Sequence, residues 1–147
     1  MGFVISTRFK FNKDSGRAGE ALAVYKLTKY GMNPHLVDGT MPYDLWLPHE
    51  NTILKVQVKS TNVINSQRGT YKFALSKNSS KDAMYNHDQC DMFALACLPL
   101  DKVIYRSDLF GRYSLSFQPE DFKALDEEES LQEALRQVME RKKNGLV

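Results

Sequence analysis

The sequence lacks the features that mark a membrane protein, a disulfide scaffold or a zinc protein. No apolar run approaches the roughly eighteen residues of a membrane helix, and the N-terminus has no charged region followed by a long apolar one. We therefore expect neither a membrane span nor a signal peptide. The only cysteines are Cys90 and Cys97, without CxxC spacing, and the three histidines are scattered. This pattern argues against a zinc site.

The sequence also lacks a large excess of positive or negative charge, because its net charge is only +2 over 147 residues. The distribution of the charge is more informative than its sum. A basic N-terminal arm is expected over residues 1–14, and the stretch from Glu120 to Glu129 is acidic. A chain near neutrality can still present a basic face when its acids lie elsewhere. Repeats and low-complexity tracts are missing, and the length suits a single domain over residues 1–147.

Hydrophobic spacing and turn residues predict a helix at each end with strands between them. The first helix is expected from Ser15 to Tyr30, where Gly31 ends it. A strand over 43–47 is expected to stop at Pro48. The other strands are expected at 33–37, 52–60, 71–76, 91–98 and 103–106. Together these elements predict an α/β fold with a mixed sheet of about five or six strands flanked by helices.

The C-terminal region is expected to be helical. Pro119 suits a first helical turn. The segment from Ser130 to Glu133 fits a capping box and predicts a helix over about 130–143. Because that helix is amphipathic, we expect it to be available as an oligomer contact.

The strand over 52–60 brings two polar side chains to one face. Strand side chains alternate, so Leu54, Val56 and Val58 share one face while Gln57 and Lys59 share the other. Gln57 and Lys59 are then roughly 7 Å apart along the strand. A hairpin can bring Asp44 opposite Gln57. A carboxylate and a second oxygen donor hold Mg²⁺, and a neighbouring lysine balances charge in phosphodiester hydrolysis.

Glu20, Asp44 and Gln57-Val58-Lys59, taken in order, resemble the PD-(D/E)xK nuclease superfamily. The resemblance implies a restriction-endonuclease-like core. It implies catalytic roles for Glu20, Asp44, Gln57 and Lys59, and a Mg²⁺ (or Mn²⁺) ion held by Asp44, Gln57, Val58 and Glu20. No small-molecule cofactor is expected. Gln57 stands where the superfamily usually has Asp or Glu, and this variant looks most like the bacterial intron-encoded homing endonucleases.

The resemblance implies a site-specific endonuclease that acts on double-stranded DNA, in the cytoplasm at the nucleoid. One domain carries one active site, so cutting both strands predicts a homo-oligomer, at least a dimer. The resemblance to homing endonucleases suggests a tetramer built as a dimer of dimers. The side chains expected to contact DNA are basic or carry amides. They are Arg8, Lys10, Lys13, Arg17, Asn62, Asn65, Gln67, Arg68 and Lys72.

Other interpretations of the same residues remain open at this point. Asp44 can be a strand-edge residue paired with a lysine, and Glu20 can serve the start of its own helix. Gln57 and Lys59 can belong to the solvated side of a half-buried strand. For the whole protein, the alternatives are a Holliday-junction resolvase and a catalytically inactive nuclease fold that only binds DNA.

Overall fold

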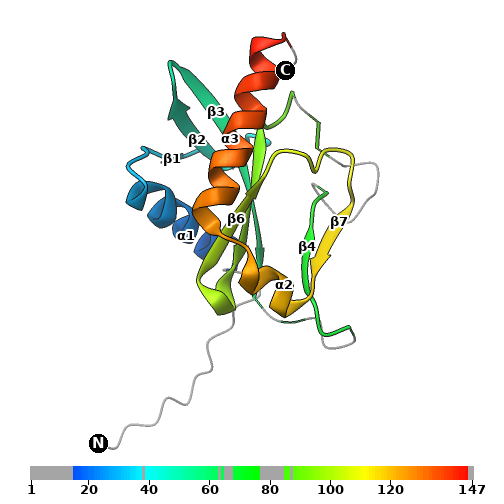
Figure 1. Cartoon of the computed structure of the whole chain (residues 1–147). Helices are drawn as coiled ribbons and strands as arrows, with labels where there is room; N and C mark the ends of the chain where they lie inside the picture. The colour runs from blue at the N-terminus through cyan, green and yellow to red at the C-terminus, as the bar shows by residue number, and fades with distance from the viewer. Residues whose placement is uncertain are drawn as a thin grey trace, which may run out of the picture.

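The computed structural model describes residues 15–37, 39–62, 64, 68–76, 85, 86 and 88–145 (Figure 1). Three α-helices, seven β-strands and one short 3-10 turn lie in these residues. In chain order they are α1 (Ser15–Lys29), β1 (His35–Leu36), β2 (Leu45–His49), β3 (Thr52–Thr61), β4 (Tyr71–Ala74), β5 (Met92–Cys97), η2 (Leu98–Leu100), β6 (Lys102–Arg106), β7 (Ser114–Phe117), α2 (Pro119–Ala124) and α3 (Glu127–Lys143).

A five-stranded mixed sheet forms the centre of the fold, in the order β1-β2-β3-β5-β6. The pairs β1–β2, β2–β3 and β5–β6 are antiparallel. The central pair, β3–β5, is parallel, with Gln57 opposite Phe93 and Lys59 opposite Leu95. This mixed sheet with flanking helices confirms the expected fold class. The register also fixes β3, which carries the candidate site, in the middle of the sheet.

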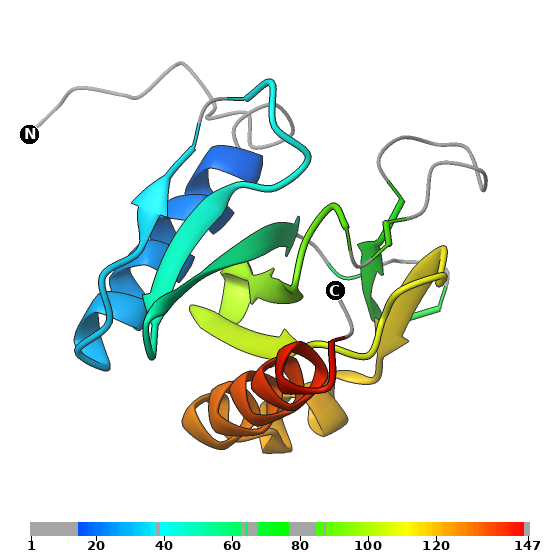
Figure 2. The ribbon, with the colours of Figure 1, turned by 90° about the horizontal axis from the view of Figure 1, so that it is seen from above.

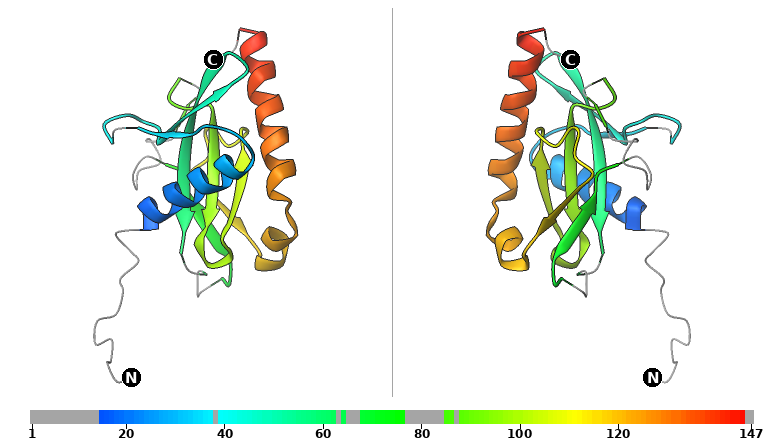
Figure 3. Two further views of the ribbon diagram at one scale, coloured as in Figure 1. Left: turned by 90° about the vertical axis from the view of Figure 1, so that its left-hand side faces the viewer. Right: turned by 90° about the vertical axis from the view of Figure 1, so that its right-hand side faces the viewer.

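The two helices α1 and α3 cover one face of this sheet (Figure 3). Ala23 and Leu27 of α1 and Leu131 of α3 pack on a layer of aliphatic strand residues that includes Val56 and Val58. The other face of β5 and β6 is covered by β4, β7 and α2, through an aromatic cluster. All six residues of β5 are buried because both of its faces are covered.

The strand β2 continues through Pro48, where the sequence predicted that it would stop. Pro48 is the register partner of Ile53, and the pairing reaches His49 opposite Thr52. The neighbour on the other side, β1, pairs only as far as Trp46. The prediction was wrong because proline lacks only the backbone donor, and an edge position does not require that donor.

The predicted strand over 71–76 does form, as β4, but it lies outside the main sheet. It pairs with β7, a strand that the sequence analysis did not predict, and the pair stands beside the main sheet and away from α1 (Figure 2). Aromatic packing holds this pair in place. Phe73 and Phe117 each contact Phe122 of α2, with ring centroids 5.8 and 5.0 Å apart respectively. Four residues such as Ser114–Phe117 carry too short a pattern to be recognised alone.

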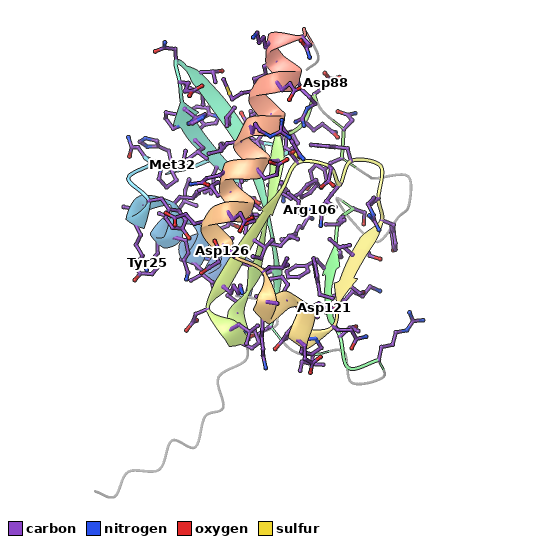
Figure 4. The ribbon with its side chains drawn as sticks, viewed as in Figure 1. Tyr25, Met32, Asp88, Arg106, Asp121 and Asp126 are labelled. Carbon is purple, nitrogen blue, oxygen red and sulfur yellow. The ribbon has the colours of Figure 1, made fainter. Side chains whose placement is uncertain are left out.

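The C-terminal helix α3 begins earlier than the capping box predicted. Asp126 is its N-cap and accepts a hydrogen bond from the Glu129 backbone N–H at 2.8 Å (Figure 4). Ser130 lies inside the helix, where its hydroxyl oxygen accepts a hydrogen bond from the Tyr105 backbone N–H. Pro119 opens α2, as expected. The first side chain able to accept from the free helix N–H groups is Asp126, so it displaces Ser130 as the cap.

The apolar side of α3 faces the protein's own sheet. Leu131, Ala134 and Val138 are buried in the same aliphatic core as Val103 and Tyr105 of β6. These residues are therefore already covered, and the expectation that the amphipathic face would serve as an oligomer contact was wrong for them. Among the described residues, no helix combines the length and apolarity needed to cross a membrane.

Candidate active site

Asp44 lies immediately before β2, at the point where the β2–β3 pairing ends. Leu45 is opposite Val56 in the register, and the Asp44 backbone N–H donates to the Val56 carbonyl at 2.9 Å. The Asp44 carboxylate then reaches along β3, and Oδ2 accepts a hydrogen bond from the Val58 backbone N–H at 2.8 Å. The hairpin therefore brings Asp44 to the part of β3 that holds Gln57 and Lys59. A backbone donor fixes the direction of the carboxylate.

Gln57 is buried rather than solvated. Its side chain is 8% exposed, and its Nε2 donates a weak hydrogen bond to the Val58 carbonyl at 3.4 Å. Leu54 and Val56, on the opposite face of β3, belong to the aliphatic core under α1 and α3. The alternation predicted from the sequence therefore holds, but the interpretation of the Gln57 face as a solvated strand surface was wrong. The same face of the sheet carries Phe93, the register partner of Gln57, which packs in one cluster with Tyr85 and with Phe73 of β4.

Lys59 lies partly buried on the same face as Gln57. Its Nζ donates a hydrogen bond to the Ser76 backbone carbonyl at 3.0 Å and lies 5.1 Å from the centroid of the Tyr85 ring. Burial lowers the pKa of the Lys59 ammonium, while the negative charge of Asp44 acts in the opposite direction. The lysine is thus a cation within electrostatic range of the Asp44 carboxylate.

The helix α1 brings Glu20 to the site through a close approach at Gly19. A Cβ atom on Gly19 would overlap the Ser60 Oγ, so no larger residue fits without displacing the Ser60 side chain. A Cβ atom on Gly16, one turn earlier, would meet nothing within 4 Å among the described residues, so the close approach is made at Gly19. Beside it, a cavity of about 450 Å³ is lined by Arg17, Ala18, Glu20, Ala21 and Leu36.

The two carboxyl groups of the site have perturbed acidities. Burial raises the pKa of Asp44, against the effects of the Val58 N–H and the Lys59 ammonium. Burial also raises the pKa of Glu20, the negative charge of Asp44 raises it further, and Arg17 opposes both. Each carboxylate therefore carries a charge that its protein surroundings do not fully stabilise. A bound cation would provide that stabilisation.

The oxygen donors at the site fit a hard divalent cation. Asp44 and Glu20 offer carboxylates, Gln57 offers an amide oxygen, and Val58 offers a backbone carbonyl. Within the described ranges, no group of three or more His, Cys, Asp or Glu side chains is placed to hold a metal. Two carboxylates with neutral oxygens and several waters suit Mg²⁺, which dehydrates reluctantly and is often held by one or two carboxylates.

Two further side chains reach the site that the sequence analysis did not assign to it. Tyr85 and Cys90 precede β5. Burial raises the pKa of Tyr85 to about 12, with a contribution from Asp44. Burial raises the pKa of the Cys90 thiol to about 12 as well, with opposing contributions from Asp91 and Lys59. No local pattern marks these residues, because only the parallel pairing of β3 with β5 brings their segment beside Lys59.

The side chains expected to contact DNA are only partly described. Arg17 is exposed beside Glu20, Asn62 is half-buried just after β3, and Arg68 is exposed. Lys72 is exposed on β4, in the separate two-stranded sheet. The remaining candidates, Arg8, Lys10, Lys13, Asn65 and Gln67, lie outside the described residues.

Without divalent metal, the carboxyl carbons of Glu20 and Asp44 are expected to titrate above their ordinary pKa values in an NMR pH titration. A raised folded-state pKa means that these groups favour the fold while protonated. Their contribution to stability is lost as the pH rises through that pKa. Arg17→Ala is expected to raise the Glu20 pKa further, because it removes a stabilising cation. A Glu20 pKa at or below its ordinary value would contradict the assigned burial.

Comparison with known proteins identifies the family of the chain and a solved structure with the same fold. The family model described as PD-(D/E)XK endonuclease matches residues 11–134, a range that includes Glu20, Asp44, Gln57 and Lys59. Among solved structures, the chain is similar to a bacterial homing endonuclease, I-Ssp6803I, with a TM-score of 0.68 and 20% identity. The match covers 92% of this chain and 97% of that chain, and it shows a shared fold. No curated protein matches the sequence. The family match spans most of the chain, and the protein therefore belongs to the PD-(D/E)XK endonuclease family.

Proposed function

We propose that the protein is a metal-dependent, site-specific endonuclease that hydrolyses phosphodiester bonds in double-stranded DNA, in the manner of a homing endonuclease. The family supports an endonuclease, and the fold shared with a solved homing endonuclease favours that class over a junction resolvase. One observation carries the proposal. Asp44 accepts a hydrogen bond from Val58, which lies between Gln57 and Lys59 on β3, and the Asp44 carboxylate is within electrostatic range of Lys59 and of Glu20 of α1.

In this proposal Asp44, Gln57 and the Val58 carbonyl hold a Mg²⁺ or Mn²⁺ ion, with support from Glu20. The weak contact between Gln57 Nε2 and the Val58 carbonyl would give way to the cation. A bound divalent cation would polarise the phosphoryl oxygen and make a nearby water more acidic. The neutral Gln57 adds an oxygen donor but no charge, so the two raised-pKa carboxylates supply the anionic part of the site.

Lys59 supplies the fixed positive charge of the site. Its ammonium is partly buried and lies within range of the Asp44 carboxylate, at the place where negative charge would develop on the scissile phosphate. A preorganised cation in a partly desolvated site stabilises such charge more strongly than a solvated one. The same group can hold an attacking water by donating a hydrogen bond.

The proposed substrate is duplex DNA, bound by an oligomer of this chain. Arg17 lines the same cavity as Glu20, and in this proposal it contacts a phosphate next to the scissile one. Each chain has one such site, so cleavage of both strands calls for at least a dimer, and a tetramer is the arrangement suggested by the homing-endonuclease likeness. We place the activity at the nucleoid, where this substrate lies.

The first test is cleavage of a phage-sized duplex genome by the whole protein with Mg²⁺, with EDTA, and with the Lys59→Ala variant. A few discrete fragments that disappear with EDTA and with the variant are expected from a long-site endonuclease. Fragments that persist with EDTA would exclude metal dependence. Absence of cutting on linear duplex, together with cutting of a four-way junction in the same tubes, would assign the protein to the resolvases. Binding without cutting of either DNA would indicate an inactive fold.

A further inference from the structure

The Lys59 ammonium is held by two groups that lie outside its own strand. Nζ donates to the Ser76 carbonyl at 3.0 Å, and it lies 5.1 Å from the centroid of the Tyr85 ring. A cation within about 6 Å of a ring face is attracted by the negative potential of that face. Lysine carries its charge on a flexible four-carbon stem, so these two contacts select one position of the ammonium among many.

The Tyr85 ring is itself fixed by the sheet. Its side chain is 7% exposed and packs edge-on against Phe93, with centroids 5.6 Å apart and planes at 87°. Phe93 lies on β5 as the cross-strand partner of Gln57, and it also packs on Phe110 at 5.6 Å. The ring that contacts Lys59 is therefore held by the strand that pairs with β3, next to the site. This packing fixes the position of the Lys59 ammonium relative to Gln57.

We propose that Tyr85 is a positioning residue, whose ring face, more than its hydroxyl, holds the Lys59 ammonium over the site formed by Asp44 and Gln57. The consequence for cleavage rests on the proposed function, but the contact itself does not. A loss of the ring removes one of the two described contacts that hold the ammonium, and the flexible stem then samples positions away from the site. Misplacement of a reacting group by about 1 Å can cost on the order of a hundredfold in rate.

The contact can be measured without any cleavage. The Hε protons of a lysine that lies over an aromatic ring face are shifted upfield by the ring current. In full-length protein labelled with ¹³C-lysine, the Lys59 Hε signals are expected upfield of those of exposed lysines, with the assignment made from Lys59→Arg. Tyr85→Phe is expected to keep this shift and Tyr85→Leu to abolish it. Phe73→Leu, which removes a buried aromatic that contacts Phe117 and Phe122, is the matched control and is expected to keep it.

Cleavage rates then test the functional consequence. Tyr85→Leu is expected to lower the single-turnover rate by about 10- to 100-fold with unchanged DNA affinity, while Tyr85→Phe restores the wild-type rate. Retention of the upfield shift in Tyr85→Leu, or equal losses of rate in the Phe and Leu variants, would overturn the proposal. If Tyr85→Leu does not fold, Tyr85→Met fills the space with a flexible side chain and repeats both measurements. If the wild-type protein cuts no duplex, the proposed function fails, while the Hε shifts still decide the role of the ring.

Discussion

Asp44→Asn is expected to lower the single-turnover rate of DNA cleavage by about a thousandfold or more without unfolding the protein. The asparagine carbonyl can still accept the Val58 N–H, so the local geometry is retained. What is lost is the negative charge that would hold the metal. Because burial raises the pKa of Asp44, its ionised form is unfavourable in the metal-free fold. The variant is therefore expected to be at least as stable as the wild type near neutral pH.

The measurements are a cleavage time course with excess protein and a thermal unfolding curve without metal. Asp108→Asn is the matched control, since Asp108 is an exposed aspartate whose ion pair with Arg106 is 2.7 Å long. The Arg106 hydrogen bond lowers the pKa of Asp108, so this control is expected to lose a little stability and keep full activity. A wild-type rate in Asp44→Asn would remove Asp44 from the site, and a large loss of stability would contradict its assigned role.

Asp91→Ala is expected to destabilise the fold by about 3 to 5 kcal/mol. This is the largest loss of stability that we predict for the substitution of a single carboxylate. Asp91 is 3% exposed, and its Oδ2 accepts a hydrogen bond from the Lys55 backbone N–H at 2.7 Å. Its Oδ1 forms an ion pair with Lys142 of α3 at 3.2 Å. The substitution leaves a buried N–H unpaired and removes the partner of a half-buried ammonium. For a chain of this size the midpoint of thermal unfolding should fall by about 10 °C.

Urea and thermal unfolding of three variants separate the contributions. Asp91→Asn keeps an acceptor for the Lys55 N–H and loses the charge, so its loss should be smaller than that of the alanine variant. Asp88→Ala is the control, because Asp88 is an exposed aspartate in the same segment (Figure 4) and only its backbone carbonyl contacts Lys55. It should change stability by no more than about 0.5 kcal/mol. Equal unfolding curves for Asp88→Ala and Asp91→Ala would show that the buried contacts carry no stability.

The sequence by itself was sufficient to place the proposed site residues Gln57 and Lys59 side by side on β3. Alternation of side chains over 52–61 puts Gln57 and Lys59 on one face, whatever the strand pairs with. The short hairpin before it leaves little choice about where Asp44 arrives. The helix bounds near Ser15 and Gly31, and the approximate positions of the main-sheet strands along the chain, followed from equally local signals. These features depend on a few bonded neighbours, and a local pattern therefore determines them.

Other features were decided by contacts between residues far apart in the sequence. The strand β2 passes through Pro48 because β1 is too short to reach it. The β4–β7 pair forms because Phe73, Phe117 and Phe122 find one another in the folded chain. The start of α3 at Glu127 depends on the choice between two capping side chains, Asp126 and Ser130, and the second is used by β6.

The surroundings of the site were also decided by contacts between residues far apart in the sequence. The sequence shows that Lys59 faces Gln57, but it does not show that Tyr85 and the Ser76 carbonyl hold its ammonium, or that Gln57 is buried. The parallel pairing of β3 with β5 brings these groups together across many residues of intervening chain. The sequence thus determined which residues face one another, through the period of a strand. Only the tertiary structure decided how buried, how charged and how fixed they are, because burial and electrostatics sum over neighbours from the whole fold.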